Sequence, residues 1–336
     1  MLSRVADALF WMSRYVERAE NVARFIDVNF HMILDGSTGQ AEGWNTLVNT
    51  TGDHEDYEKR YQDATREKVV HFLTFDLDNP NSILSCVCSA RENARTIRDV
   101  ITSDMWEQMN SFYLMLRDPH AVQRVAETPY DFFSQVKQAS QSFVGITDLT
   151  LSHGEAWNFC RVGRLLERTD KTTRLLDVKY YLLKTLQAAA EHDASQDVMQ
   201  WSAVLKSASA LEMYRKKYRK INSEGVVKFL LTDREFPRSA LYCLNSADEA
   251  IHNITGTPRG SHRTPAEREL GRLCADIAYT DVKEILDDEL HVYLDSFQTK
   301  LNVIGEAIYE TFFSLKTPKQ SQIQSQSGQS QTQTMR

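Results

Sequence analysis

The stretches YVERAENVARFIDV (Tyr15–Val28) and LLERTDKTTRLLDV (Leu165–Val178) carry one charged pattern twice, 150 residues apart. Each contains Glu-Arg, a second Arg six places after the first Arg, and then Asp-Val. Apolar residues recur every three or four places in both copies, which indicates a helix that packs along its length against another helix. The pattern therefore predicts an internally duplicated helix. We expect the two copies to contact each other, with the small residues Ala23 and Thr173 at their crossing.

Charged residues follow both edges of the apolar face in each copy. With 3.6 residues per turn, four of them form a stripe along one edge of each helix. The stripes are Glu17, Glu20, Arg24 and Asp27 in the first copy, and Glu167, Asp170, Arg174 and Asp177 in the second. Arg18 and Arg168 fall on the opposite edge. Each copy therefore brings carboxylates and guanidinium groups close to the surface on which a partner helix packs.

Spacing alone leaves two interpretations of these charges open. Glu and Arg four residues apart form ordinary intrahelical pairs worth about 0.3–0.5 kcal/mol each, and crossed Glu–Arg bonds would hold the bundle in register. Alternatively, the charges line a polar pocket in which Arg binds a carboxylate or phosphate and the carboxylates bind an amine or a metal. In an enzyme of this second kind, Glu17 and Glu167 are the candidate acid–base catalysts, with Arg24 and Arg174 holding the substrate.

The rest of the chain predicts further helices and no convincing strand, because period-two alternation is nearly absent. Thr264-Pro265-Ala266-Glu267, for example, is a capping box with Pro at the first helical position. Long helices are expected near 4–35, 82–117, 129–150, 154–190 and 282–315, and shorter ones near 55–76, 196–220, 224–231, 237–255 and 265–280. Together they predict an all-α helical bundle in one domain, residues 1–316. Residues 317–336 are rich in Gln and Ser and have too little apolar surface to offset the entropy of ordering, so we expect a disordered tail.

Composition narrows the classes of function. The 336 residues carry a net charge of −7, which disfavours nucleic acid and anionic membranes as partners. Neither a signal peptide nor a membrane span is visible, so a cytoplasmic location is expected. The five Cys are predicted to be reduced, and Cys86 and Cys88 diverge on a helix, which is poor geometry for a metal. Glycine-rich nucleotide motifs are missing as well, so we expect neither a metal nor a cofactor, and any ATP chemistry belongs to a partner.

Two further arginines are candidates for ligand binding. Arg95 lies in ARENARTIRDV (Ala90–Val100), which we interpret as a third copy of the pattern in uncertain register. Arg238 follows a proline at a predicted helix start, where free backbone N–H groups and a guanidinium would make an anion site. Alternatively, the neighbouring Asp233 or Glu235 neutralises Arg238 locally.

Long stretches of the chain resemble the alpha-E domain family of bacterial all-helical proteins, which is named for a recurrent Glu-Arg signature. The matching stretches are MLSRVADALFWMSRYVERAENVARFIDV (1–28), ARENARTIRDVITSDMWEQMN (90–110), GEAWNFCRVGRLLERTDKTTRLLDVKYY (154–181) and FLLTDREFPRSALYCL (229–244). Asn245 departs from the pattern, because members often carry an acidic residue there. The resemblance implies a helical domain whose genes often neighbour those of circularly permuted ATP-grasp ligases, to which some members are fused. Transglutaminase-like peptidases and a proteasome-related hydrolase are implied as other frequent neighbours.

The expected function is therefore an accessory component of an ATP-grasp amide-ligase system, one that binds or positions a peptide or amino-acid substrate through the Glu-Arg stripes. An enzyme in its own right and a purely structural scaffold are the alternatives. A pocket lined by both stripes would separate the first two functions from the scaffold. Activity of the isolated protein would separate the enzyme from the accessory component.

Overall fold

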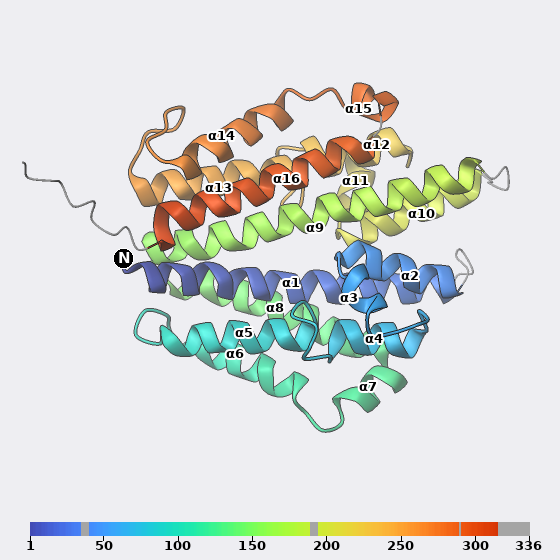
Figure 1. Cartoon of the computed structure of the whole chain (residues 1–336), viewed down its shortest axis with the longest axis horizontal. Coiled ribbons are helices and arrows are strands. Elements are labelled where there is room, and N and C mark those ends of the chain that lie inside the picture. Colours follow the sequence, from blue (N-terminus) through green and yellow to red (C-terminus); the bar gives the residue numbers. More distant parts are fainter. Residues whose placement is uncertain (35–39, 189–193, 289, 315–336) are drawn as a thin grey trace, which may run out of the picture.

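Two long helices, α1 (Ser3–Leu34) and α9 (Glu155–Ala188), run side by side through the middle of the molecule (Figure 1). They are parallel and in register, since the amino group of Met1 bonds Glu155 Oε2 at 3.0 Å where both helices begin. The computed structural model describes residues 1–34, 40–188, 194–288 and 290–314. The predicted contact between the helices at 4–35 and 154–190 is confirmed, because α1 and α9 pack against each other. Their origin by duplication stays a prediction.

The backbones of α1 and α9 approach each other very closely at Gly163. A Cβ atom added there would lie 2.2 Å from the carbonyl oxygen of Phe10, which no side chain tolerates without movement of the backbone. Ala23 and Thr173, at the expected crossing further along, are fully buried. Gly163 is therefore a close contact point between the two helices that the pattern did not reveal, and the crossing near Ala23 and Thr173 stays a prediction.

Each central helix carries a matching group of three helices. The helices α5 (Ile83–Thr96) and α8 (Pro129–Thr150) pack on α1, and α6 (Ser103–Leu116) packs on both of them. The helices α13 (Ala240–Thr255) and α16 (Leu290–Ile308) pack on α9, and α14 (Pro265–Ala278) packs on both of them. Figure 1 shows the first group below the central pair and the second above it. The whole is an all-α bundle, and the described ranges contain no strand.

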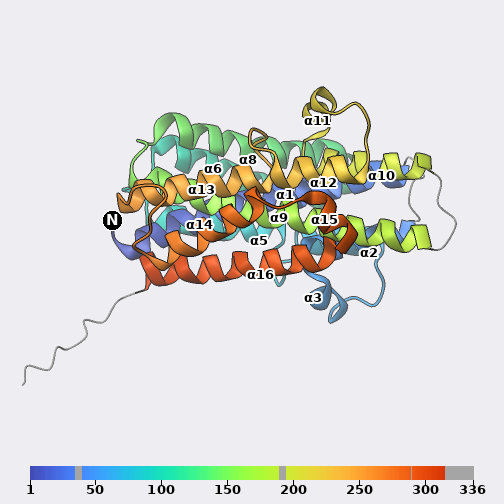
Figure 2. The same ribbon diagram turned by 90° about the horizontal axis from the view of Figure 1, so that it is seen from above.

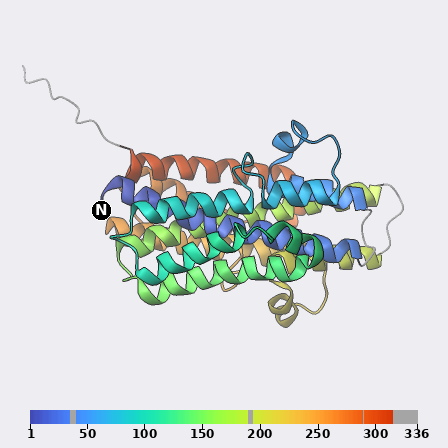
Figure 3. The ribbon, with the colours of Figure 1, turned by 90° about the horizontal axis from the view of Figure 1, so that it is seen from below.

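Short elements complete the two groups. They are α2 (Gln40–Thr51), α3 (His54–Glu58), α4 (Arg66–Thr74), α7 (Ala121–Glu127), α10 (Ala194–Ser207), α11 (Leu211–Lys217), α12 (Ser223–Thr232), α15 (Val282–Asp288) and the π-helical turn η1 (Tyr309–Phe313). The segments α3 and α11 project from opposite faces of the bundle (Figure 2). From below, α5, α6 and α8 cover α1 (Figure 3).

Two aromatic clusters give the projecting segments the same local structure. The clusters are Tyr57, Tyr61 and Phe72 in the first group, and Tyr214, Tyr218 and Phe229 in the second. In each, the two Tyr rings stack, at 4.9 and 4.8 Å between centroids, and both meet the Phe ring edge-on. The hydroxyl of Tyr57 donates to the carbonyl of Asp63, and that of Tyr214 donates to the carbonyl of Lys220. The likeness between the two groups therefore extends beyond α1 and α9.

Several predicted helices are wrong in extent. The predicted helix 82–117 is two helices, because Thr102 caps a new one through Met105 N–H and buried Ile97 and Ile101 anchor the turn between them. The ranges 55–76, 196–220 and 282–315 each contain more than one element, and α2 and α7 were not predicted. The Thr264 capping box is present, with Glu267 bonding back to the cap N–H. The predicted tail, 317–336, lies outside the described residues.

Candidate functional site between the central helices

The Glu-Arg pair of each central helix bonds the Glu-Arg pair of the other. Arg168 donates through Nε and Nη2 to the two carboxylate oxygens of Glu17, both at 2.8 Å. Arg18 donates in the same way to Glu167, at 2.6 and 3.0 Å. These are two crossed, two-pronged ion pairs, a geometry that suits a planar guanidinium and a carboxylate. The parallel register of α1 and α9 makes the exchange possible, because it places residues 17 and 18 beside 167 and 168.

Additional donors saturate both carboxylates. Glu17 also accepts from Arg238 Nη1 at 3.2 Å and from Asn21 Nδ2 at 3.0 Å. Glu167 accepts in addition from Arg14 Nε at 2.9 Å. A buried carboxylate needs such a full set of donors to offset the loss of water. The arrangement therefore has the hallmarks of a structural network that holds α1, α9 and the start of α13 together.

Electrostatics keep both carboxylates ionised. Burial raises the pKa of Glu17, but Arg168 and Arg238 outweigh it and hold that pKa at about 2, below the ordinary 4.5. Burial also raises the pKa of Glu167, but Arg18 and Arg14 outweigh it, so the pKa of this carboxyl lies below its ordinary value. An acid–base catalyst needs a pKa near the working pH and access to substrate. Both side chains are completely enclosed, so this geometry lends no support to their predicted catalytic role, which stays a prediction.

The two stripes differ in exposure further along the helices. Arg24 is nearly buried and bonds Glu20 through Nε at 3.0 Å and the hydroxyl of Ser209. Arg174 bonds Asp170 at 3.0 Å, but 31% of its side chain is exposed. Its guanidinium reaches Gly52, where an added Cβ would lie 3.1 Å from Nη1. Gly52 and Ser209 both have positive φ, 86° and 50°, so the two arginines end at similar left-handed turns.

Other predicted site residues are engaged elsewhere. Lys137 of α8 bonds Asp27 at 2.6 Å, and His291 of α16 contacts Asp177 at 2.6 Å. Arg95 is exposed near the end of α5 and bonds Glu92 of the same helix at 2.9 Å. These contacts tie outer helices to the central pair or stabilise one helix locally. They do not converge on one site.

The predicted anion site at Arg238 is already filled by carboxylates of the chain. Arg238 is buried beside the N-cap of α13 and donates to Glu20 Oε1 at 2.7 Å as well as to Glu17. Asp233, the expected local partner, instead bonds Lys217 at 2.6 Å. Burial lowers the pKa of Arg238, as does the nearby Arg168. In this structure the carboxylates that pair with Arg238 come from α1, so the ligand-binding role of this residue stays a prediction.

A cavity of about 440 Å³ opens beside the crossed pairs, between α1, α9, α16 and η1. Charged side chains at its wall are Arg14, Asp170 and Glu306, and aromatic rings there include Trp11 and Tyr309. The Arg14 guanidinium lies 4.9 Å from the centre of the Trp11 ring. Among the residues of the predicted stripes, Asp170 contributes to this cavity. It is large enough for an amino acid or a short peptide.

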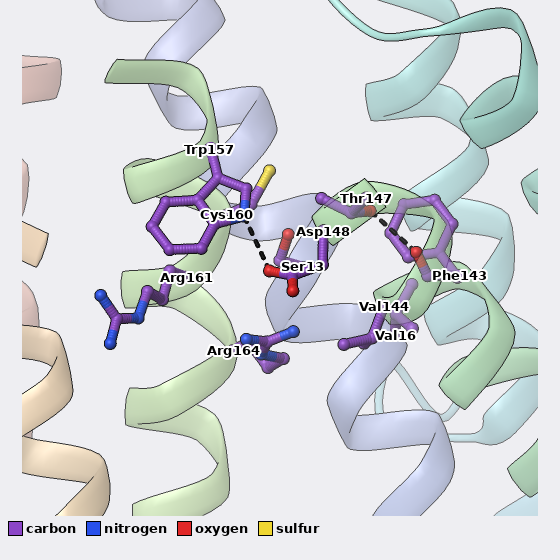
Figure 4. A pocket seen from close by; sticks show the side chains of 10 residues that line it. All are labelled: Ser13, Val16, Phe143, Val144, Thr147, Asp148, Trp157, Cys160, Arg161 and Arg164. Atoms are coloured by element: carbon purple, nitrogen blue, oxygen red, sulfur yellow. Dashed lines mark hydrogen bonds between the residues drawn. The ribbon is translucent and has the colours of Figure 1, made fainter. Parts of the chain in front are cut away.

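A much smaller cavity, about 10 Å³, lies on the other side of the central pair, between α1, α8 and α9 (Figure 4). Arg164 borders it, and in α9 this residue stands 150 places after Arg14. Trp157 and Arg161 line the cavity as well, and Trp157 Nε1 donates to Asp148 at 3.0 Å. Arg14 and Arg164 were not singled out from the sequence, although their spacing of 150 residues matches that of the two Glu-Arg stretches.

Within the described residues, no three His, Cys, Asp or Glu side chains are grouped so that they could hold a metal ion. Burial raises the pKa of Cys86 and Cys274 to about 12 and that of Cys160 and Cys243 to about 11, so these thiols stay protonated. In the same part of the chain, every helix is too short or too polar to cross a membrane.

Residues 1–313 match the model of the Alpha-E family, described as a predicted alpha-helical domain with a conserved ER motif. The chain belongs to this family. The Glu-Arg pairs at 17–18 and 167–168 are the ones that cross between α1 and α9. This Alpha-E domain is similar to uncharacterized proteins of Mycobacterium bovis and Mycobacterium tuberculosis, with 24% identity over 286 residues. The match covers 77% of this chain but 30% of each relative. No solved structure matches the chain.

Proposed function

We propose that this Alpha-E domain binds the substrate of an amide ligase and presents it to that enzyme. The observation that carries the proposal is the 440 Å³ cavity beside the crossed pairs. Arg14 can bind a carboxylate, Asp170 and Glu306 can bind an amine, and the aromatic rings can cover an apolar side chain. A peptide or an amino acid carries all three kinds of group. The substrate class is therefore a peptide-like molecule.

The proposed partner is a circularly permuted ATP-grasp ligase, on the strength of the family resemblance. The mycobacterial relatives are consistent with a modular role, because the matching region takes up 30% of their length. A transglutaminase-like peptidase and a proteasome-related hydrolase are further proposed partners from the same resemblance. A cytoplasmic location belongs to the proposal as well, since an ATP-dependent ligase works where ATP is available.

Binding is favoured over catalysis by the state of the candidate acid–base residues. Glu17 and Glu167 are enclosed and held ionised by arginines, and neither lines the 440 Å³ cavity. Two of the charged groups that do line it, Arg14 and Asp170, are themselves paired with Glu167 and Arg174. Such groups can position a ligand by hydrogen bonding without giving up a proton.

The test is reconstitution with the ligase. The full chain should co-purify with the ligase, and adding it should raise amide-bond formation several-fold. In Gly305→Leu the new side chain projects at the cavity wall, where an added Cβ meets nothing within 4 Å, so the variant should fold and lose that gain. Gly271→Leu is the matched control, since its Cβ also meets nothing within 4 Å and it lies outside the cavity. Equal turnover with both variants would overturn the binding role of the cavity.

A further inference from the structure

Arg164 is a half-buried arginine without a bonding partner among the described residues. Its Nε is fully enclosed and meets no acceptor. Burial lowers its pKa, and so does the nearby cation Arg168; the carboxylates of Glu17 and Asp148 act on it only at longer range. A buried charge normally requires a hydrogen-bonded counter-ion. Arg164 therefore has an enclosed Nε–H group that finds no acceptor among the described residues.

The reason lies in the competition for Glu17. Arg168 and Arg238 occupy both oxygens of that carboxylate, together with Asn21. On the equivalent side, Arg14 reaches Glu167 because no residue competes as Arg238 does. The structure thus leaves Arg164 directed at the small cavity instead of at a carboxylate of its own chain (Figure 4).

Other groups around this cavity can complete an anion site. The candidate side chains come from α1 (Ser13), α8 (Thr147) and α9 (Trp157, Arg161). Figure 4 shows Ser13 close to Arg164, whereas Arg161 points away from them beside the Trp157 ring. Arg161 stacks on the Trp157 ring at 5.1 Å and bonds Glu249 of α13 at 2.9 Å. Asp148 is exposed and bonds the Trp157 indole, so its charge faces the cavity mouth.

We propose that Arg164 binds the carboxylate group of a ligand that enters between α8 and α9. The space of about 10 Å³ holds one atom the size of a water oxygen, which suits one carboxylate oxygen. The carboxylate of Asp148, which lines the same cavity, disfavours the more highly charged phosphate. The second oxygen and the rest of the ligand extend past Arg161 and Trp157 toward solvent. This site lies on the opposite side of the central pair from the 440 Å³ cavity, so it does not rest on the proposed function.

The experiment is a thermal melt of the full chain in sodium acetate and in sodium chloride at equal ionic strength. Acetate should raise the melting temperature by about 2 °C relative to chloride, since a ligand that binds only the folded state stabilises it. Arg164→Met should show no such shift, and in chloride it should melt no earlier than the wild type because the repulsion from Arg168 is gone. The exposed Arg215→Met, on α11, should respond to acetate as the wild type does.

Three further arms make the outcome decisive. Sodium phosphate should give the same melting temperature as chloride. The proposal is overturned if acetate raises the melting temperature no more than chloride or phosphate does. It is also overturned if Arg164→Met responds to acetate as the wild type does. If Arg164→Met does not fold, Arg164→Lys takes its place, because Lys keeps the charge but loses the planar fork, and its shift should fall at least by half. N-acetylglycine then separates the sources: a shift equal to that of acetate indicates a peptide terminus, and none indicates a small free acid.

Discussion

Arg14 and Arg164 hold equivalent places in the two central helices and meet different surroundings. Arg14 bonds Glu167 at 2.9 Å and borders a cavity of about 440 Å³. Arg164 bonds no described residue and borders one of about 10 Å³. The same residue type at the same spacing thus forms a structural pair on one side and an unsatisfied charge on the other.

The difference traces to one pair of positions outside the central helices. Asn81 and Arg238 each directly precede the serine that caps the next helix, α5 or α13. Asn81 accepts from Arg18 Nη1 at 2.6 Å, so it adds an acceptor near Glu167. Arg238 instead adds a donor to Glu17. Because Asn81 accepts a bond from Arg18, Glu167 keeps room for Arg14. Because Arg238 donates to Glu17, no oxygen of that carboxylate is left for Arg164.

The largest effect is expected at the crossed pairs that both sides share. Arg168→Met removes the two-pronged partner of the buried Glu17 and should lower the free energy of unfolding by about 3–5 kcal/mol. Arg18→Met should cost as much on the other side. Urea denaturation measures both, and Glu17→Gln combined with Arg168→Met should cost less than the sum of the single changes. Additive costs would show that the pair does not act as a unit.

Lowering the pH should weaken the same network of ion pairs and reduce the stability of the fold. Glu17 has a folded pKa of about 2 against an ordinary 4.5, so the folded state disfavours its protonation. Its contribution to stability is complete above about pH 4.5 and is lost as the pH falls toward 2. Urea midpoints between pH 7 and pH 3 should therefore fall less steeply in Glu17→Gln than in the wild type. Glu249→Gln, an exposed carboxylate on α13, serves as the control and should keep the wild-type slope.

A smaller effect separates the two arginines directly. Arg14→Met takes one charged donor from Glu167 and should cost about 1.5–3 kcal/mol. Arg164→Met takes no bond from any described residue and removes a half-buried charge that lies near Arg168, so its cost should be near zero. Unfolding measured by circular dichroism in a carboxylate-free buffer checks both. Equal losses would show that Arg164 has a partner in solution.

The register that makes the two positions equivalent can be tested at Gly163. In Gly163→Ala the new methyl group meets the Phe10 carbonyl at 2.2 Å and must push the two helices apart, at a cost of about 1–3 kcal/mol. In Gly145→Ala, on α8, the methyl group meets nothing within 4 Å and should stabilise the helix slightly. Melting temperatures compare the two. A neutral Gly163→Ala would mean that α1 and α9 lie further apart at this point.

Local sequence determined the helical class and the central pair of this protein. The three-and-four spacing of apolar residues from Val5 to Phe30 requires a buried helical face, and a capping serine or threonine with a well-placed Glu marks a helix start such as Thr264. The helix predicted over 82–117 was wrong because its break at Ile97 to Thr102 depends on how Ile97 and Ile101 are buried by other helices. Helical periodicity continues through such a break in the sequence.

Only the tertiary structure decided what the charges do. The sequence placed Glu17 beside Arg18 and Glu167 beside Arg168, but the crossed pairing depends on the parallel register of two helices 150 residues apart. Arg238 reaches Glu17 from 221 residues away, and that contact leaves Arg164 unsatisfied. Spacing within one helix reports which residues share a face. Ion pairs between helices form between residues that are far apart in sequence and only a few ångströms apart in space. Folding must bring the groups together before Coulomb attraction and hydrogen bonding can act between them.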